Sequence, residues 1–139
     1  MSDAFAFEIV TPERKVLSVQ AREAVIPGVE GSFGVLPGHA PFLTRLGVGE
    51  MAYRDDQGWH YLTAADGFVE VLPDRVTVIA FIAEQAREID IERAREARRR
   101  AEESLKQASK LSDQDMLMVE LSLKKALTRL DVANRVAHR

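Results

Sequence analysis

The chain has 139 residues, of which 46% are apolar and 29% charged, and its net charge is −3. This length fits one domain, or one small domain with an appendage, and the acidic balance gives no sign of a nucleic-acid-binding protein. Because the chain contains no cysteine, disulfide frameworks and thiolate metal sites are excluded.

Glycine and proline divide the chain into two parts. All eight glycines and all five prolines lie between Pro12 and Pro73. Because these residues turn the backbone sharply, the first part must fold back on itself repeatedly. The rest of the chain is rich in strong helix formers. Residues 1–83 carry 6 basic and 11 acidic side chains, whereas residues 84–139 carry 13 and 11, so the second part is mildly basic.

The first part has the pattern of short β-strands. Bulky apolar side chains alternate with smaller or polar ones from Phe5 to Ile9, the period of a strand with one buried face. Further strands are expected over residues 16–19, 24–26, 49–54, 60–64, 68–72 and 75–81. Turns are expected at Pro27-Gly28, Pro37-Gly38, Asp55–Gly58, Asp66-Gly67 and Pro73-Asp74. Short strands separated in this way predict a β-sandwich or barrel domain over residues 1–84.

Residues 85–139 are predicted to form an α-helical domain. Its first helix is expected over about residues 90–108, because Asp90 is a good N-cap. Ile89 and Ala94 stand at the positions of a hydrophobic staple around that cap. Small residues along the helix leave room for another helix to approach closely.

A second helix is expected over about residues 113–136, with Ser112 as its cap. Its apolar residues recur in alternating steps of three and four, the spacing of a coiled-coil seam. The seam consists of Met116, Val119, Leu123, Ala126, Leu130, Ala133 and Ala137. A short connector between two such helices predicts an antiparallel hairpin. Isolated helices of this length are marginal in water, so the hairpin is a candidate for a moving part.

No pattern typical of catalysis is present. The three histidines, His39, His60 and His138, are far apart in the sequence and share no metal-ligand spacing. No glycine-rich phosphate loop and no Gly-x-Ser-x-Gly elbow occurs. We therefore expect a non-enzymatic protein without a metal site.

Two groups of basic residues invite a functional interpretation. Arg98-Arg99-Arg100 could contact RNA, but interleaved glutamates favour a salt-bridged helix face. Arg93 and Arg100 share one face of the first helix, as Lys125 and Arg129 share one face of the second. In an antiparallel hairpin these four cations could converge and suit a polyphosphate. Exposed basic residues countered by neighbouring carboxylates are the alternative.

The order of motifs resembles a known family, the epsilon subunits of bacterial F-type rotary ATP synthases. The resemblance covers essentially the whole chain and is carried by four segments. They are Glu30-Gly-Ser-Phe-Gly-Val-Leu-Pro-Gly-His-Ala-Pro41, Asp66-Gly-Phe-Val-Glu-Val71, Val76-Thr-Val-Ile-Ala80 and Ile89-Asp-Ile-Glu-Arg-Ala94. The family fold is a β-sandwich followed by a C-terminal helical hairpin, which agrees with the pattern of this sequence.

The resemblance implies a non-catalytic subunit of the central stalk, at the cytoplasmic face of the bacterial membrane. The sandwich would bind the gamma subunit and the c-ring and so couple proton-driven rotation to ATP synthesis. The rotor-facing surface would include Glu30, Ser32, His39 and Phe42. The longest apolar stretch has only strand length, so contact with the membrane would be through these partners.

The resemblance also implies regulation by the hairpin, which in this family contacts the alpha and beta subunits and inhibits ATP hydrolysis. In this family the hairpin either folds down against the sandwich, the compact form, or extends along the stalk. No cofactor is required, although in some members ATP favours the compact form. The residues implicated there match Glu84, Ile89, Asp90, Arg93, Ala94, Arg100 and Arg129. Lys125 stands where ATP-binding relatives carry arginine, which keeps the charge but loses the planar fork.

Two other functions are weighed against this one. A freestanding nucleic-acid-binding module would use the basic helix around residues 98–100, but the chain is acidic and this run has no interleaved aromatic residues. A small hydrolase would have only His39 and Asp66 as isolated candidate residues.

Overall fold

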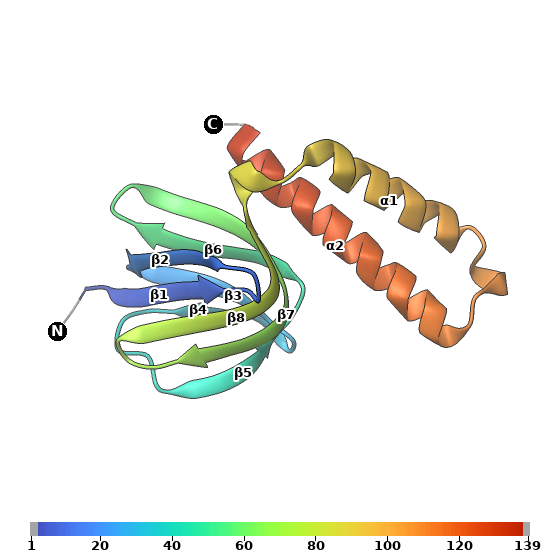
Figure 1. Cartoon of the computed structure of the whole chain (residues 1–139). Helices are drawn as coiled ribbons and strands as arrows, with labels where there is room; N and C mark the ends of the chain where they lie inside the picture. Colours follow the sequence, from blue (N-terminus) through green and yellow to red (C-terminus); the bar gives the residue numbers. More distant parts are fainter. Residues whose placement is uncertain (1–2, 138–139) are drawn as a thin grey trace. The chain divides into compact units, whose positions relative to one another are not determined.

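The computed structural model describes residues 3–137, and the chain divides into two compact units, Met1–Gln85 and Ala86–Arg139. Figure 1 shows strands in the first unit and helices in the second. The strands are β1 (Phe5–Val10), β2 (Lys15–Ala21), β3 (Glu23–Gly28), β4 (Gly31–Val35), β5 (Phe42–Leu46), β6 (Gly49–Asp55), β7 (Gly58–Val71) and β8 (Arg75–Gln85). A β unit followed by a helical pair is the predicted fold class.

The strands of the first unit form one coiled sheet with the order β2-β1-β8-β7-β5-β3-β4. β6 pairs with both β3 and β7, so β3, β5, β7 and β6 close a ring of strand pairings. Most neighbouring strands are antiparallel, but β1 and β8 are parallel. This closure explains the sandwich-like form and leaves β2 and β4 as the two ends of the sheet.

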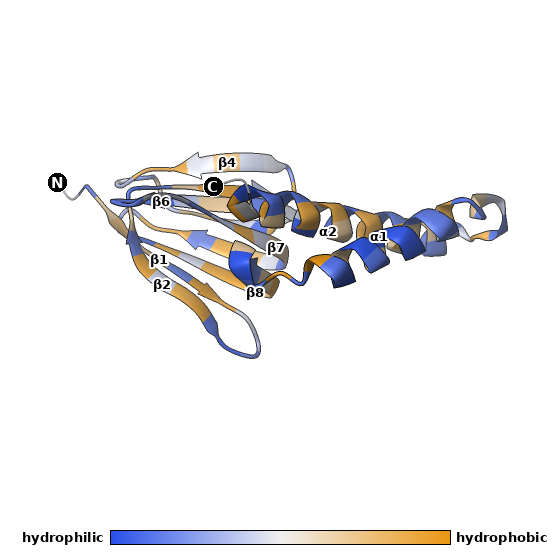
Figure 2. Ribbon diagram, turned by 90° about the horizontal axis from the view of Figure 1, so that it is seen from above, coloured by the Kyte–Doolittle hydropathy of each residue, from blue (hydrophilic) through white to orange (hydrophobic). Residues whose placement is uncertain are grey.

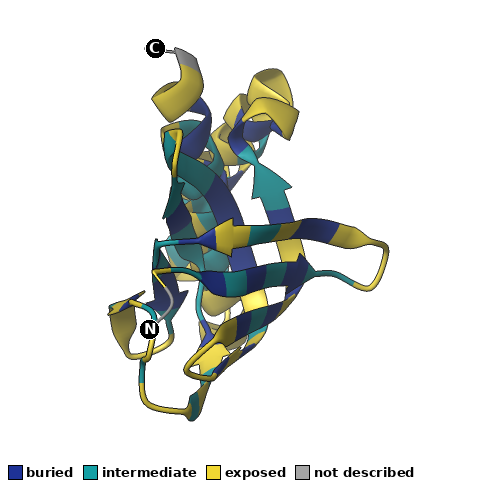
Figure 3. Cartoon of the chain, turned by 90° about the vertical axis from the view of Figure 1, so that its left-hand side faces the viewer, coloured by how far each residue is buried: buried dark blue, intermediate teal, exposed yellow. Residues whose placement is uncertain are grey.

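Alternating side chains build the core of this unit. Phe5, Phe7 and Ile9 of β1 are fully buried, as the period of two predicted. Phe7 packs against Tyr53, with ring centroids 5.7 Å apart. The dark blue and yellow segments that alternate along the strands in Figure 3 show the same inward and outward alternation.

The turns predicted from proline and glycine had different outcomes. At Pro37-Gly38 the prediction is confirmed, since Gly38 has φ +83° and the His39 N–H donates to the Leu36 carbonyl at 3.2 Å. At Pro27-Gly28 it is wrong: both residues end β3, and the turn lies two residues later, at Val29-Glu30. β4 and β5 were not predicted: β4 contains two glycines, and the adjacent polar residues Thr44 and Arg45 interrupt the alternation in β5.

Asp66-Gly67 is a kink inside β7 and not the predicted turn between two strands. Asp66 has φ +59° and Gly67 has φ +144°. A Cβ on Gly67 would lie 1.9 Å from the Ile79 carbonyl oxygen, so only glycine fits there. Before the kink β7 pairs with β6, and after it with β5, so the kink passes the strand from one neighbour to the other.

The second unit consists of η1 (Ala86–Glu88), α1 (Ile91–Leu105), η2 (Ala108–Lys110) and α2 (Asp113–Ala137). Both predicted caps are confirmed. The Asp90 carboxylate accepts the Arg93 N–H at 3.1 Å, and the Ser112 hydroxyl accepts the Asp115 N–H at 3.1 Å. α1 ends three residues before the expected Ala108, because i→i+3 hydrogen bonds such as Gln107 N–H to the Ser104 carbonyl replace the helical ones.

The helices α1 and α2 lie antiparallel and side by side (Figure 1). The only buried side chains of α1 are alanines, Ala94 and Ala101, which matches the expected close approach. Along the α2 seam Ala126 and Ala133 are buried, and Met116, Val119, Leu123 and Leu130 are half-buried. Val132 is also buried although it lies off the seam. The side chain of Ala137 and all of His138 lie outside the described residues.

Most of the α1 surface is hydrophilic (blue in Figure 2), whereas α2 carries more apolar residues. This difference follows from the sequence. Four pairs of oppositely charged side chains, each three or four residues apart, link glutamates to basic residues along α1. Such pairs support an exposed helix that buries little apolar surface.

Candidate functional site

The four residues predicted to face a rotor lie at the β4 end of the sheet. Glu30 is exposed in the turn between β3 and β4, and Ser32 is exposed on β4. His39 and Phe42 are half-buried and stand before and at the start of β5. The structure brings His39 and Phe42 together, with ring centroids 5.2 Å apart.

A third aromatic residue joins this pair. Phe33 of β4 meets Phe42 edge to face, with ring centroids 5.2 Å apart. The His39 ring is fixed further by a contact of 2.8 Å between its Nδ1 and the Ala40 carbonyl oxygen. The turn segment that the sequence singled out is therefore packed beside a cluster of three rings, Phe33, His39 and Phe42.

A second surface of this unit was missed from the sequence. We call it the apolar face, and it consists of Leu43, Phe68, Ile79 and Phe81, whose exposed fractions are 69%, 51%, 54% and 73%. Phe68 and Ile79 are direct partners across β7 and β8, and Phe81 follows Ile79 on the same side of β8. Leu43 lies diagonal to Phe68 across β5 and β7.

Polar side chains border the apolar face. Arg45 is the partner of Phe68 on β5, and Glu70 is the partner of Leu43 on β7. An exposed apolar centre with a charged rim is the anatomy of a protein-binding surface. The signal for it was the run Val76–Ile82, in which both alternating sets of side chains are nearly all apolar. The sequence analysis predicts only a strand over residues 75–81 there.

In the second unit the basic residues of α1 fall into two sets. Arg95, Arg98 and Arg99 form ion pairs with Glu92, Glu102 and Glu96, at 2.7, 3.2 and 2.6 Å. Arg93 and Arg100, within the described part of the chain, form no ion pair within 4.0 Å. The Arg98-Arg99-Arg100 run is therefore not a free basic stripe, which weakens the nucleic-acid alternative.

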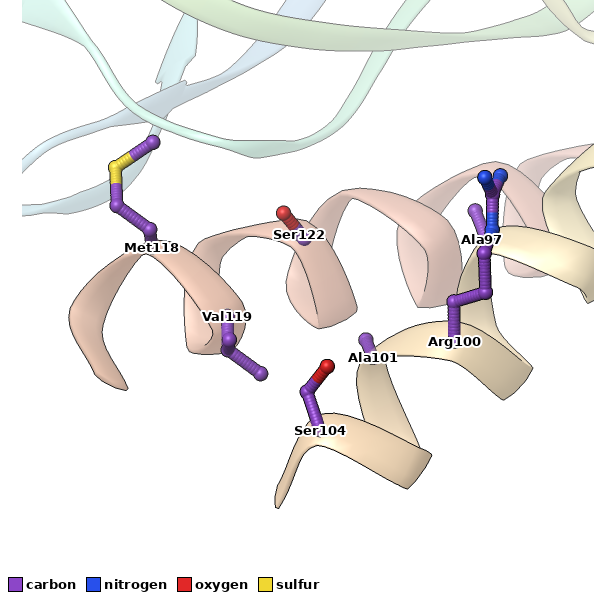
Figure 4. Close-up of a pocket in the computed structure, with 7 residues that line it drawn as sticks. All are labelled: Ala97, Arg100, Ala101, Ser104, Met118, Val119 and Ser122. Carbon is purple, nitrogen blue, oxygen red and sulfur yellow. The ribbon is translucent and has the colours of Figure 1, made fainter. Parts of the chain in front are cut away.

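Arg100 stands beside a groove between the two helices. The groove measures about 340 Å³ and is lined by Ala97, Arg100, Ala101, Ser104, Met118, Val119 and Ser122. Figure 4 shows the Arg100 side chain rising on the same side of the helix pair as Ser122 and Met118. Ser122 and Arg100 thus line the same groove from the two helices.

Helix geometry extends this side of the hairpin to the other predicted cations. Lys125 and Arg129 follow Ser122 by three and seven residues, so they continue its stripe along α2. Arg93 precedes Arg100 by seven residues and continues the stripe of α1 in the opposite chain direction. Since the helices are antiparallel, both stripes advance toward the same end of the hairpin. Helix spacing therefore predicts that all four cations lie along one edge, which we call the cationic edge.

The remaining predicted nucleotide contacts differ in their positions. Ile89 and Ala94 are buried on either side of the cap, with exposed fractions of 8% and 0%, as a hydrophobic staple requires. Asp90 is exposed and caps α1. Glu84 belongs to the first unit, where its carboxylate lies 3.5 Å from the Thr63 hydroxyl that donates to it.

The positions of His39 and Asp66 speak against the hydrolase alternative. Phe42 pairs with Val71 and Leu46 with Gly67, so His39 and Asp66 lie beyond opposite ends of β5. Residues that far apart cannot act together on one bond. Among residues 3–137 no group of three or more metal-binding side chains is found. The same residues include no helix with the length and apolar character needed to cross a bilayer.

Comparisons with known proteins agree over the whole chain. Residues 4–86 match the family described as "ATP synthase, Delta/Epsilon chain, beta-sandwich domain", and residues 87–134 match its "long alpha-helix domain". The ATP synthase epsilon chain of Citrifermentans bemidjiense is 46% identical over 139 residues, 100% of both chains. That of Syntrophobacter fumaroxidans is 46% identical over 97% of this chain and 99% of its own.

The fold also matches a solved structure. A chain in the cryo-EM structure of the Euglena gracilis mitochondrial ATP synthase, OSCP/F1/c-ring, superimposes with a TM-score of 0.78. The match covers 100% of this chain and 84% of that chain, at 18% sequence identity. At that identity the likeness shows the fold alone.

Proposed function

The chain belongs to the ATP synthase delta/epsilon chain family, and on this premise we propose that it is a non-catalytic subunit of the central stalk of an F-type ATP synthase. The observation that carries the proposal is the full-length match to epsilon chains at 46% identity. The first unit would couple the rotation of the gamma subunit and c-ring to ATP synthesis. The second would regulate ATP hydrolysis by the alpha and beta subunits. The site of action would be the cytoplasmic face of the bacterial membrane, reached through these partners.

Two surfaces of the first unit support its docking on a rotor. The apolar face offers four large exposed side chains with a charged rim. The turn segment carries Glu30, Ser32, His39 and Phe42 at the β4 end of the sheet. We assign the apolar face to the gamma subunit, because an exposed apolar centre with a charged rim suits a protein partner. The polar turn segment then remains for the c-ring loops.

Cross-linking tests the assignment of the turn segment. Ser32→Cys should cross-link to a cysteine in the c-ring loop of the assembled enzyme, since Ser32 is exposed on the edge strand β4. Ser18→Cys is the matched control, because Ser18 is also exposed but lies on β2 at the other end of the sheet. Equal cross-linking of both variants, or of neither, would contradict the assignment.

The cationic edge of the hairpin supports regulation by ATP. Arginine supplies paired donors and lysine a point charge, and both suit a triphosphate. Arg93 and Arg100 have no ion pair to break before they bind one. ATP that bound only the compact form would stabilise it by about 2.7 kcal/mol at 100 times its Kd. That is enough to shift a nearly balanced equilibrium between compact and extended hairpins.

Calorimetric titration of the full chain with ATP tests this site. Arg93→Ala should lose binding, whereas Arg95→Ala, on the same turn but paired with Glu92, should bind as the parent does. Lys125→Arg should tighten binding, because the planar fork makes two parallel hydrogen bonds to phosphate. Equal losses in Arg93→Ala and Arg95→Ala would point to general attraction by a basic helix. No binding to the parent at millimolar ATP would refute ATP sensing and leave the edge as a docking surface for acidic catalytic subunits.

A further inference from the structure

Four side chains of β5 and β7 form a square on the outer side of the first unit. Leu43 is the partner of Glu70, and two residues further along the same strands Arg45 is the partner of Phe68. All four side chains are exposed. The two apolar side chains therefore occupy one diagonal of the square, and a cation and a carboxylate occupy the other. We call Arg45 and Glu70 the charged diagonal.

The two charges of this diagonal are not paired with each other. Residues that lie diagonally across two antiparallel strands are about 7–8 Å apart, within reach of long side chains. Nevertheless, in the described part of the chain neither Arg45 nor Glu70 takes part in an ion pair within 4.0 Å. Glu8, on the same outer side, differs because Lys15 and Arg75 approach its carboxylate to 3.8 and 3.9 Å. An opposite charge for each end of the diagonal must therefore come from outside these residues.

The charged diagonal would lose water when a partner covers the apolar face. A charge that is removed from water without an opposite charge or hydrogen bonds is costly. Apolar contact has no direction, so the apolar side chains can hold a partner without fixing how it is turned. Two opposite charges at fixed corners do fix it, because a partner rotated by half a turn would bring like charges together.

We infer that the charged diagonal fixes the orientation of the gamma subunit on the apolar face. The gamma surface that covers this face would carry a carboxylate opposite Arg45 and a cation opposite Glu70. The inference rests on the proposed docking of the gamma subunit, and it adds the chemistry of the partner surface. The apolar side chains supply most of the buried area, and the charged diagonal supplies the specificity.

Charge reversal in the full chain tests this inference through the affinity for the gamma subunit. Arg45→Glu and Glu70→Arg should each raise Kd about tenfold at low salt, because each change brings like charges together. The double variant Arg45→Glu/Glu70→Arg should raise Kd at least as much, although its composition and net charge equal those of the parent. All three losses should shrink at high salt, whereas the loss in Phe81→Ala should not.

The matched control is Glu92→Arg/Arg95→Glu, because it exchanges two charges that already pair with each other on α1 at 2.7 Å. This control should bind the gamma subunit as the parent does. Urea unfolding of every charge variant should have the midpoint of the parent, since the exchanged side chains are exposed. A screen of acidic-to-basic changes on the gamma subunit should find one that restores binding by Arg45→Glu and not by Glu70→Arg.

Binding of the double variant with the Kd of the parent would overturn the inference, because the net charge and not its pattern would then matter. A urea midpoint that falls in step with the affinity would overturn it as well, by showing a role in the fold. If Phe81→Ala loses affinity and the charge variants do not, docking on the apolar face stands and the role of the charged diagonal fails. If the parent does not bind the gamma subunit, the proposed docking itself fails, and the inference with it.

Discussion

Phe81→Ala is expected to weaken docking on the rotor without weakening the fold. Phe81 is 73% exposed and lies beside Ile79 on the apolar face, so it contributes little to the core. Full burial of a phenylalanine side chain contributes about 1.5–3 kcal/mol. Docking that covers the exposed part would therefore gain about 1–2 kcal/mol from this one residue, which corresponds to about a five- to thirtyfold change in Kd.

The assay is the affinity of the chain for the isolated gamma subunit, measured beside urea unfolding of each variant. Leu117→Ala is the control, because Leu117 is 56% exposed but belongs to α2 in the other unit. Phe81→Ala should lose affinity while its free energy of unfolding stays within about 0.5 kcal/mol of the parent. An unchanged affinity would refute the assignment of the apolar face. A fall in stability as large as the fall in affinity would show that Phe81 acts in the fold.

Three further predictions concern the fold. Gly67→Ala should lower the free energy of unfolding by about 3 kcal/mol or more, since its Cβ would meet the Ile79 carbonyl. Gly58→Ala is the control, because Gly58 has φ +116° but open space around it, and its free energy of unfolding should fall by less in the same urea titration. Ala94→Leu should lower the thermal stability of the helical unit by about 1–3 kcal/mol through overpacking, because Ala94 is fully buried on the face toward α2. The hydrogen bond from His60, at 2.9 Å, holds the pKa of Asp55 below its usual range. The stability that the ionised carboxylate contributes is therefore complete above its unfolded pKa of about 3.9 and is lost as the pH falls through the lower folded value. In urea titrations, the free energy of unfolding that Asp55→Asn loses relative to the parent should therefore shrink below about pH 4.

The helical unit was the more predictable part of the fold. Its signals are local: Asp90 and Ser112 cap helices because their side chains reach N–H groups three residues away. A period of three and four residues also marks which side of each helix is buried. The early end of α1 could not be predicted, since residues 106–111 contain no glycine or proline and the change to i→i+3 bonds leaves no compositional trace.

The strand unit was less predictable because its pairings join distant residues. The dipeptides Pro27-Gly28 and Pro37-Gly38 carry the same local signal, yet only the second forms a turn. The first is held extended by β4, whose Ser32 is the partner of Pro27. Similarly, Asp66-Gly67 continues a strand because β8 accompanies β7 past the kink on both sides.

The two candidate surfaces also differ in how far the sequence predicts them, because only one depends on pairings between distant strands. The cationic edge followed from spacing within helices and needed only their antiparallel packing. The apolar face joins residues of β5, β7 and β8, so it exists only once the strand order is known.

The central claim is that the two units have separate tasks, docking for the first and regulation for the second. The measurement that tests it most directly is ATP hydrolysis by the alpha, beta and gamma subunits reconstituted with the full chain or with a chain that ends at Ile89. Both chains should assemble with the gamma subunit, and only the full chain should inhibit hydrolysis. Equal rates of hydrolysis in the two assembled complexes would contradict the regulatory role of the hairpin, and failure of the short chain to assemble would contradict the separation of tasks.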